Sequence, residues 1–66
     1  MREMLLAASK SYYVGMINKH ISNVEILLTR SVGIGEHPQH IEEIDKLLQK
    51  IVDAQEKLKE IQHFKL

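Results

Sequence analysis

The segment SVGIGEHPQH, residues 31–40, is the stretch of this chain whose composition most suggests chemistry, because it combines a glutamate and two histidines with two glycines and the only proline. Glu36, His37 and His40 place oxygen and nitrogen donors close together, and donors of these kinds bind Zn²⁺. Zinc requires three or four ligands. His37 and His40 are three residues apart and could share one helix face, which accounts for two ligands. These three residues are the candidate metal ligands, but histidines are common on the surface near a turn, and we expect neither a metal nor a cofactor.

A glycine-rich loop in front of a helix can also bind phosphate through its backbone N–H groups. The stretch GIGEHP does not fit this pattern, because Pro38 replaces the third glycine of GxGxxG and the lysine of a P-loop is missing. Glu36 would in addition repel a phosphate group. Gly33 tolerates the left-handed backbone that often follows a helix end, and proline loses nothing at the first position of a helix. We therefore predict a turn over residues 32–37.

The second half of the chain carries a regular apolar pattern. Apolar residues alternate at spacings of three and four, which is typical of a helix-packing seam. This seam contains Ile44, Leu47, Ile51, Ala54, Leu58 and Ile61. Ile41 and Leu48 widen it to a stripe, which suits a helical bundle better than a strict two-stranded coil. The pattern predicts a helix over about residues 38–64.

The first half has a similar pattern that is less regular, and it predicts a helix over about residues 2–31. Its stripe consists of Val14, Ile17, Ile21, Val24 and Leu28, flanked on one side by Tyr13, His20 and Leu27. Gly15 interrupts this helix, at a cost of about 1 kcal/mol relative to alanine. Two interpretations of this glycine stay open: it is simply tolerated, or its missing Cβ lets a neighbouring element approach closely.

Polar and aromatic residues within the first helix allow several roles. Asn18, His20 and Asn23 are most simply exposed, but one of them could be buried and set the register of an assembly, as buried asparagine does in coiled coils. Tyr12 and Tyr13 are expected to cover the end of the core or to contact a partner.

These elements predict an all-α fold with a single domain, residues 1–66, formed by an antiparallel two-helix hairpin. In a chain below about 70–80 residues, one core rarely supplies more than about 3–5 kcal/mol, and the absence of cysteine excludes disulfides. Two helices alone cover only one side of each stripe. We therefore predict a homodimer that forms a four-helix bundle, with a larger helical oligomer as the alternative.

The predicted oligomer interface consists of Val14, Ile17, Ile21, Val24, Leu28, Ile44, Leu47, Leu48, Ile51, Leu58 and Ile61. Further apolar residues lie off the narrowest seam and could serve a second interface: Leu5, Leu6, Leu27, Leu48, Val52 and Phe64. No water-excluding pocket is expected in a hairpin, so an enzyme is not predicted. The predicted function is that of a structural or protein-interaction module.

Charge and hydropathy argue against other classes of function. Nine basic and nine acidic residues give no net charge, so nucleic-acid binding is not expected. A small nucleic-acid-associated or regulatory factor is therefore only the alternative to the predicted interaction module. Acidic residues at the start of the second helix, Glu42, Glu43 and Asp45, also argue against a recognition helix. The chain has no run of about 20 apolar residues, and its first apolar block is too short for a secretory signal, so we expect a cytoplasmic location.

The stretch NVEILLTRSVGIGEHPQHIEEIDKLLQKI, residues 23–51, together with YVGMINKHISNVEILL before it, resembles a group of small uncharacterised proteins encoded by tailed bacteriophages, especially marine and cyanobacterial ones. The resemblance covers most of the chain and is carried by a turn and two amphipathic helices. It implies a viral setting in the host cytoplasm. It brings no catalytic or binding residues with it.

Overall fold

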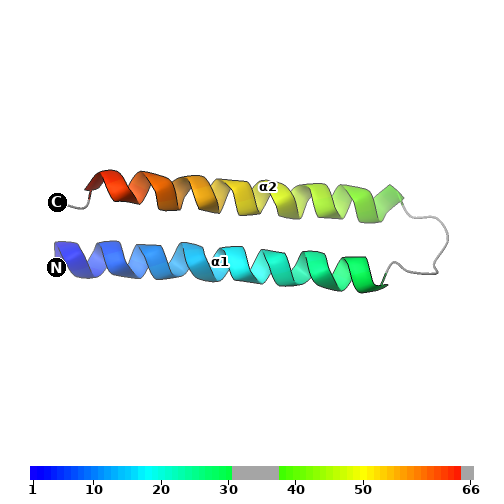
Figure 1. Cartoon of the computed structure of the whole chain (residues 1–66), viewed down its shortest axis with the longest axis horizontal. Coiled ribbons are helices and arrows are strands. Elements are labelled where there is room, and N and C mark those ends of the chain that lie inside the picture. Colours follow the sequence, from blue (N-terminus) through cyan, green and yellow to red (C-terminus); the bar gives the residue numbers. More distant parts are fainter. Residues whose placement is uncertain (31–37, 65–66) are drawn as a thin grey trace.

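The computed structural model describes residues 1–30 and 38–64, which form two long helices side by side (Figure 1). Helix α1 spans Arg2–Arg30, α2 spans Pro38–Ile61, and the short 3-10 helix η1 spans Gln62–Phe64. The helices run in opposite directions, and the described residues contain no strand. The predicted all-helical hairpin is confirmed.

α2 is built largely from residues that favour helix formation, such as leucine, glutamate, lysine and glutamine, whereas α1 mixes leucine, alanine and methionine with β-branched and aromatic residues. α2 begins at Pro38, where the fixed φ angle suits a first turn and the missing N–H removes no helical hydrogen bond. In the last turn of α1, the Thr29 hydroxyl donates a hydrogen bond of 2.9 Å to the Glu25 carbonyl oxygen. The predicted turn with Gly33 lies outside the described residues.

The hairpin is a thin rod. Its Cα atoms extend over 52 × 14 × 11 Å, and the radius of gyration is 15.6 Å, compared with about 11 Å for a compact domain of this length. Within the described residues, α1 and α2 therefore each have only the other as a long helical neighbour. As a result, no side chain in residues 1–30 and 38–64 is fully buried, and the hydrophobic core is a single seam between the helices.

On α2, the seam follows the spacing seen in the sequence. Leu47, Ile51 and Ala54 are buried, and the residues that continue their row are half-buried. These half-buried residues are Ile44, Leu58 and Ile61. Ile41 and Leu48, which widen the row in the sequence, are exposed because they lie at its edge and α1 covers only the centre.

On α1, the seam is rotated relative to the stripe that the sequence suggests. The least exposed residues of this helix are Leu6, Tyr13, Met16, Ile17, His20, Asn23, Val24 and Leu27. Val14, Ile21 and Leu28, which form one side of the predicted stripe, are exposed instead. The row that faces α2 is thus the flanking one, one residue earlier in the chain, and it includes His20.

Gly15 lies in α1 with open space around it. A Cβ atom built on this residue meets no other heavy atom within 4 Å. This excludes close approach of a described element as the reason for the glycine and favours the simpler interpretation, a tolerated glycine in a helix.

Substitution of Gly15 by alanine is therefore expected to stabilise the hairpin by about 0.5–1 kcal/mol, because alanine loses less conformational entropy in a helix. Urea unfolding followed by circular dichroism at a fixed protein concentration measures this change. A loss of stability would show that the position is covered in the assembled protein.

Candidate functional site

The most prominent surface feature is a set of apolar side chains in two rows that the hairpin leaves exposed. On α1 the row consists of Val14, Ile21 and Leu28, which are 40%, 45% and 50% exposed. On α2 it consists of Ile41, Leu48 and Val52, which are 72%, 49% and 45% exposed. We refer to these six residues as the outer apolar face.

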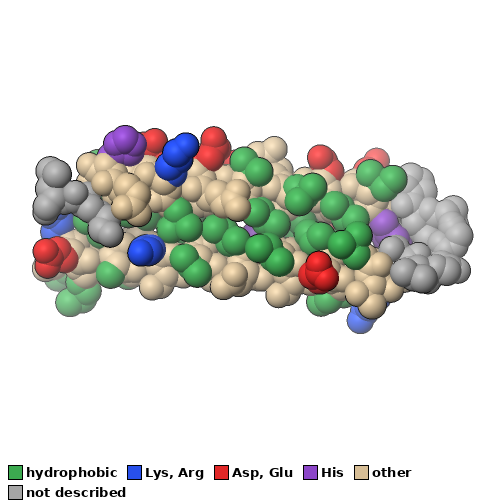
Figure 2. All heavy atoms as spheres, in the orientation of Figure 1, with side chains coloured by type: hydrophobic (Ala, Val, Ile, Leu, Met, Phe, Trp, Pro, Cys, Tyr) green, Lys and Arg blue, Asp and Glu red, His purple; other side chains and the backbone are tan. Residues whose placement is uncertain are grey.

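The two rows lie on the same side of the hairpin. On each helix the row follows the seam by one residue: Ile21 comes after His20 on α1, and Leu48 comes after Leu47 on α2. One residue is a rotation of about 100° in the same sense around each helix. Because the helices are antiparallel, these rotations lead to the same side of the rod. Figure 2 shows this side, where hydrophobic side chains cover both helices and the line between them.

The apolar character of this side is confined to one half of the rod. Hydrophobic side chains are densest over the half that leads to residues 31–37 (Figure 2). Toward the open end, where α1 begins and α2 ends, the helical spacing places Lys10, Gln55 and Lys59 on the same side. Glu25 and Asp45 lie beside the apolar half. The side is thus apolar near the turn and polar near the open end.

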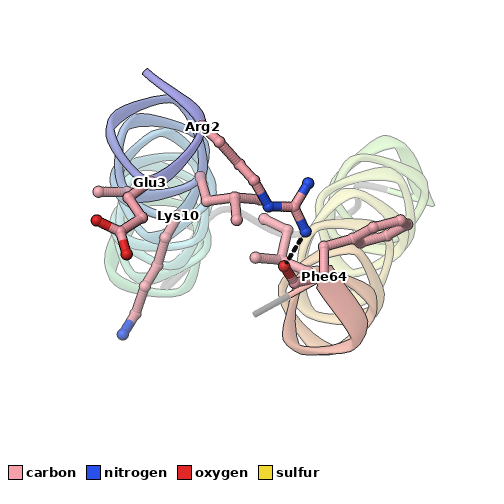
Figure 3. A pocket seen from close by; sticks show the side chains of 7 residues that line it. Arg2, Glu3, Lys10 and Phe64 are labelled. Atoms are coloured by element: carbon pink, nitrogen blue, oxygen red, sulfur yellow. Dashed lines mark hydrogen bonds between the residues drawn. The ribbon is translucent and has the colours of Figure 1, made fainter. Parts of the chain in front are cut away.

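A groove lies at the open end of the hairpin, with a volume of about 540 Å³. Its lining residues are Arg2, Glu3, Leu6, Ala7, Lys10, Ile61 and Phe64. The Arg2 guanidinium donates a hydrogen bond to the Phe64 carbonyl oxygen and so connects the two helices, whereas Glu3 and Lys10 extend away from α2 (Figure 3). The polar side chains that line it, Arg2, Glu3 and Lys10, do not converge on one point (Figure 3).

The two tyrosines form a cluster with Lys57. The Tyr12 and Tyr13 rings meet edge to face with their centroids 5.2 Å apart, and the Lys57 Nζ atom lies 5.8 Å from the Tyr13 centroid. Tyr13 is half-buried in the seam and Tyr12 is exposed. Tyr13 thus covers part of the seam within α1 and not the end of the core that the sequence suggested, and the cation–π contact contributes about 0.5–1 kcal/mol at such an exposed site.

His20 is the most deeply buried polar residue that the structure describes. It is 3% exposed and lies in the seam of α1, and neither ring nitrogen has a hydrogen-bond partner among the described residues. Burial of a polar group without a partner costs about 1–3 kcal/mol. Of the three polar residues considered from the sequence, Asn18 is exposed, Asn23 is half-buried and His20 is the buried one.

The candidate metal ligands are only partly within the described residues. Glu36 and His37 lie outside them, and His40 is half-buried in the first turn of α2. Among residues 1–30 and 38–64, no three histidine, aspartate or glutamate residues are grouped so that they could hold a metal ion. Neither described helix has the length and apolar character needed to cross a membrane.

The structure divides the predicted oligomer interface into three groups. Leu47 and Ile51 are buried between the helices of one chain. Half-buried members are Ile17, Val24, Ile44, Leu58 and Ile61, and exposed members are Val14, Ile21, Leu28 and Leu48. Ile41 and Val52 complete the exposed set; they are not members of the predicted oligomer interface, but the sequence assigns Ile41 to the widened stripe and Val52 to the possible second interface. Their position one residue after the seam row is the signal that identifies them.

Comparison with known proteins identifies no relative of this chain. No family model matches the chain, and no curated protein or solved structure matches it. A function must therefore be inferred from the surfaces described above, and the outer apolar face is the strongest candidate.

Proposed function

We propose that this chain is a structural or protein-interaction module that self-associates, and that two hairpins pack through their outer apolar faces into a four-helix bundle. The observation that supports the proposal is the contiguous exposure of apolar side chains from both helices on one side of the rod. Contiguous patches of this kind are uncommon on monomeric proteins unless they bind something.

The thin seam supports the need for a partner. Only Leu47, Ile51 and Ala54 among the described apolar residues are buried, and a chain of this length has little other means of stabilisation. A second hairpin on the outer apolar face would remove six further large side chains from water. Each fully buried valine, leucine or isoleucine contributes about 1.5–3 kcal/mol, so the half-exposed rows of two copies would add substantially to the stability.

The pattern of the face favours a second copy as the occupant. Val14, Ile21 and Leu28 repeat every seven residues, and Ile17 and Val24 fall between them at the spacing of a helix-packing seam. Such a row packs well against another helix of the same kind. A two-fold axis lets one face cover its own copy, which is the commonest way in which identical chains associate.

The proposed setting is the cytoplasm of a bacterial cell infected by a tailed phage, supported by the resemblance of residues 23–51 to small phage proteins. In this setting a dimer would still expose the opposite side of each hairpin, which carries Tyr12, Lys50 and Lys57. This side could contact a further protein. No enzymatic activity is part of the proposal.

Sedimentation equilibrium over a wide range of protein concentrations tests the proposal. We expect a mass near twice the chain mass of 7.7 kDa, with dissociation only at the lowest concentrations. A folded chain that stays at 7.7 kDa throughout would refute self-association. A stable mass of three or more chains would replace the four-helix bundle by a larger assembly.

A further inference from the structure

We infer that the two copies pair in antiparallel orientation, with their turns at opposite ends of the assembly. In this arrangement, the apolar half of each hairpin covers the apolar half of the other, and the two open ends project in opposite directions. The inference rests on the proposed self-association and specifies how the second copy is seated.

The uneven distribution of polarity on the contact side is the basis of the inference. The outer apolar face ends at Val14 on α1 and at Val52 on α2. Beyond these residues the same side carries Lys10 and Lys59, both exposed, and these lie at similar heights along the rod because the two helices are antiparallel. A good pairing must cover the apolar half without placing the lysines of one copy against those of the other.

A parallel pairing, with both turns at the same end, fails this requirement. A two-fold axis along the rod places α1 of one copy opposite α2 of the other over their whole lengths. Lys10 would then face Lys59 of the partner subunit, and Glu25 would face Asp45 of the partner subunit. Enclosing two ammonium groups beside each other between packed helices is strongly unfavourable, because both lose water and neither gains a counter-ion.

An antiparallel pairing meets the requirement. A two-fold axis across the rod, at the level of Ile21 and Leu48, places α1 opposite α1 and α2 opposite α2. Lys10 is eleven residues from Ile21, or about 16 Å along the helix, whereas the end of α1 at Arg30 is nine residues from Ile21, or about 14 Å. Lys10 therefore passes the end of the partner's α1.

The same relation holds for the second helix. Lys59 is eleven residues from Leu48, or about 16 Å, and the start of α2 at Pro38 is ten residues from Leu48, or about 15 Å. Lys10 of one copy and Lys59 of the partner subunit thus lie on opposite sides of the axis, about 33 Å apart along the rod at 1.5 Å per residue. The antiparallel pairing covers the apolar rows and encloses no like-charged pair at the open ends.

Distance measurement between spin labels tests this orientation. The chain contains no cysteine, so Met4→Cys provides a single label site near the open end, at a position that is 68% exposed. Met4 is seventeen residues from Ile21, which gives about 50 Å between the two labels of an antiparallel dimer at 1.5 Å per residue. A parallel dimer would give about 20–30 Å, the width of a bundle of helices about 10–12 Å in diameter.

Ser22→Cys is the matched control, because this exposed residue lies at the level of the proposed axis. Both orientations predict about 20–30 Å for its two labels, since only the bundle width separates them. Short distances at both sites in a dimeric sample would overturn the antiparallel orientation and leave self-association intact. A mass of one chain for the labelled variants and the parent, with no dipolar coupling at either site, would overturn both proposals.

Discussion

Replacement of Ile21 by glutamate is expected to convert the dimer into monomers at concentrations where the parent chain is fully paired. Ile21 lies at the centre of the outer apolar face. The variant would carry two carboxylates into the contact, one from each copy, and each would lose water without gaining a cation. An unpaired buried charge costs several kcal/mol, and each 1.4 kcal/mol changes the dissociation constant tenfold, so we expect the dimer to weaken by at least about 100-fold.

Ile26→Glu is the matched control for this experiment. Ile26 belongs to the same helix and is 47% exposed, close to the 45% of Ile21. It lies five residues further on, which is a rotation of about 140°, so it points away from the outer apolar face. Sedimentation equilibrium should show that this variant remains paired. If the two variants dissociate to the same extent, the contact does not lie on the face that we propose.

Replacement of His20 by leucine is expected to raise the free energy of unfolding by about 1–3 kcal/mol. The imidazole is buried in the seam and its ring nitrogens have no hydrogen-bond partner among the described residues. Leucine has a similar size and brings no polar atoms that would lose water. For a chain of this size the gain corresponds to a rise in Tm of about 4–24 °C. Thermal unfolding should be recorded at one fixed concentration, because dimerisation couples to stability.

The matched substitution is His63→Leu. His63 is exposed in η1, and its Nε2 atom lies 3.8 Å from a carboxylate oxygen of Glu60. Loss of such an exposed contact changes stability by less than about 0.5 kcal/mol. A lower stability of His20→Leu relative to the parent would indicate that the imidazole finds a partner in the assembled protein. A spread of oligomer masses in this variant would indicate that His20 sets the register, as polar residues do in coiled coils.

The second helix could be predicted well from its sequence. Its seam residues lie opposite a charged face, so the row that packs against α1 can be identified from the spacing of apolar residues. Leu47, Ile51 and Ala54 accordingly are the buried apolar residues of the structure. The hairpin also follows from simple rules, because two amphipathic helices joined by a short connection pack as antiparallel neighbours.

The rotation of the first helix could not be predicted with the same success. Its sequence contains two adjacent rows with a period of seven, one through Tyr13, His20 and Leu27 and one through the three residues that follow them. Apolar periodicity favours the second row, because Ile21 is apolar where His20 is polar. The structure places the first row against α2. Contact with a neighbouring helix, which a pattern within one helix does not include, decides between them.

The outer apolar face depends on both rotations at once, so it is visible only in the folded hairpin. From sequence, Val14, Ile21 and Leu28 were assigned to the same seam as Ile17 and Val24. Their separation into seam and surface follows from the placement of α2. The metal hypothesis for Glu36 and His37 concerns residues outside those that the structure describes, and it stays a sequence-based hypothesis.

The antiparallel pairing of α1 and α2 has a consequence for the order in which the chain folds. Contacts near the turn join residues about ten positions apart, whereas the contact of Arg2 with Phe64 spans 62 positions. Because the entropy lost on closing a loop grows with its length, contacts next to the turn form first and the helices zip together toward the open end. Fraying proceeds in the reverse direction. The half that carries the outer apolar face is therefore the first to form and the last to open.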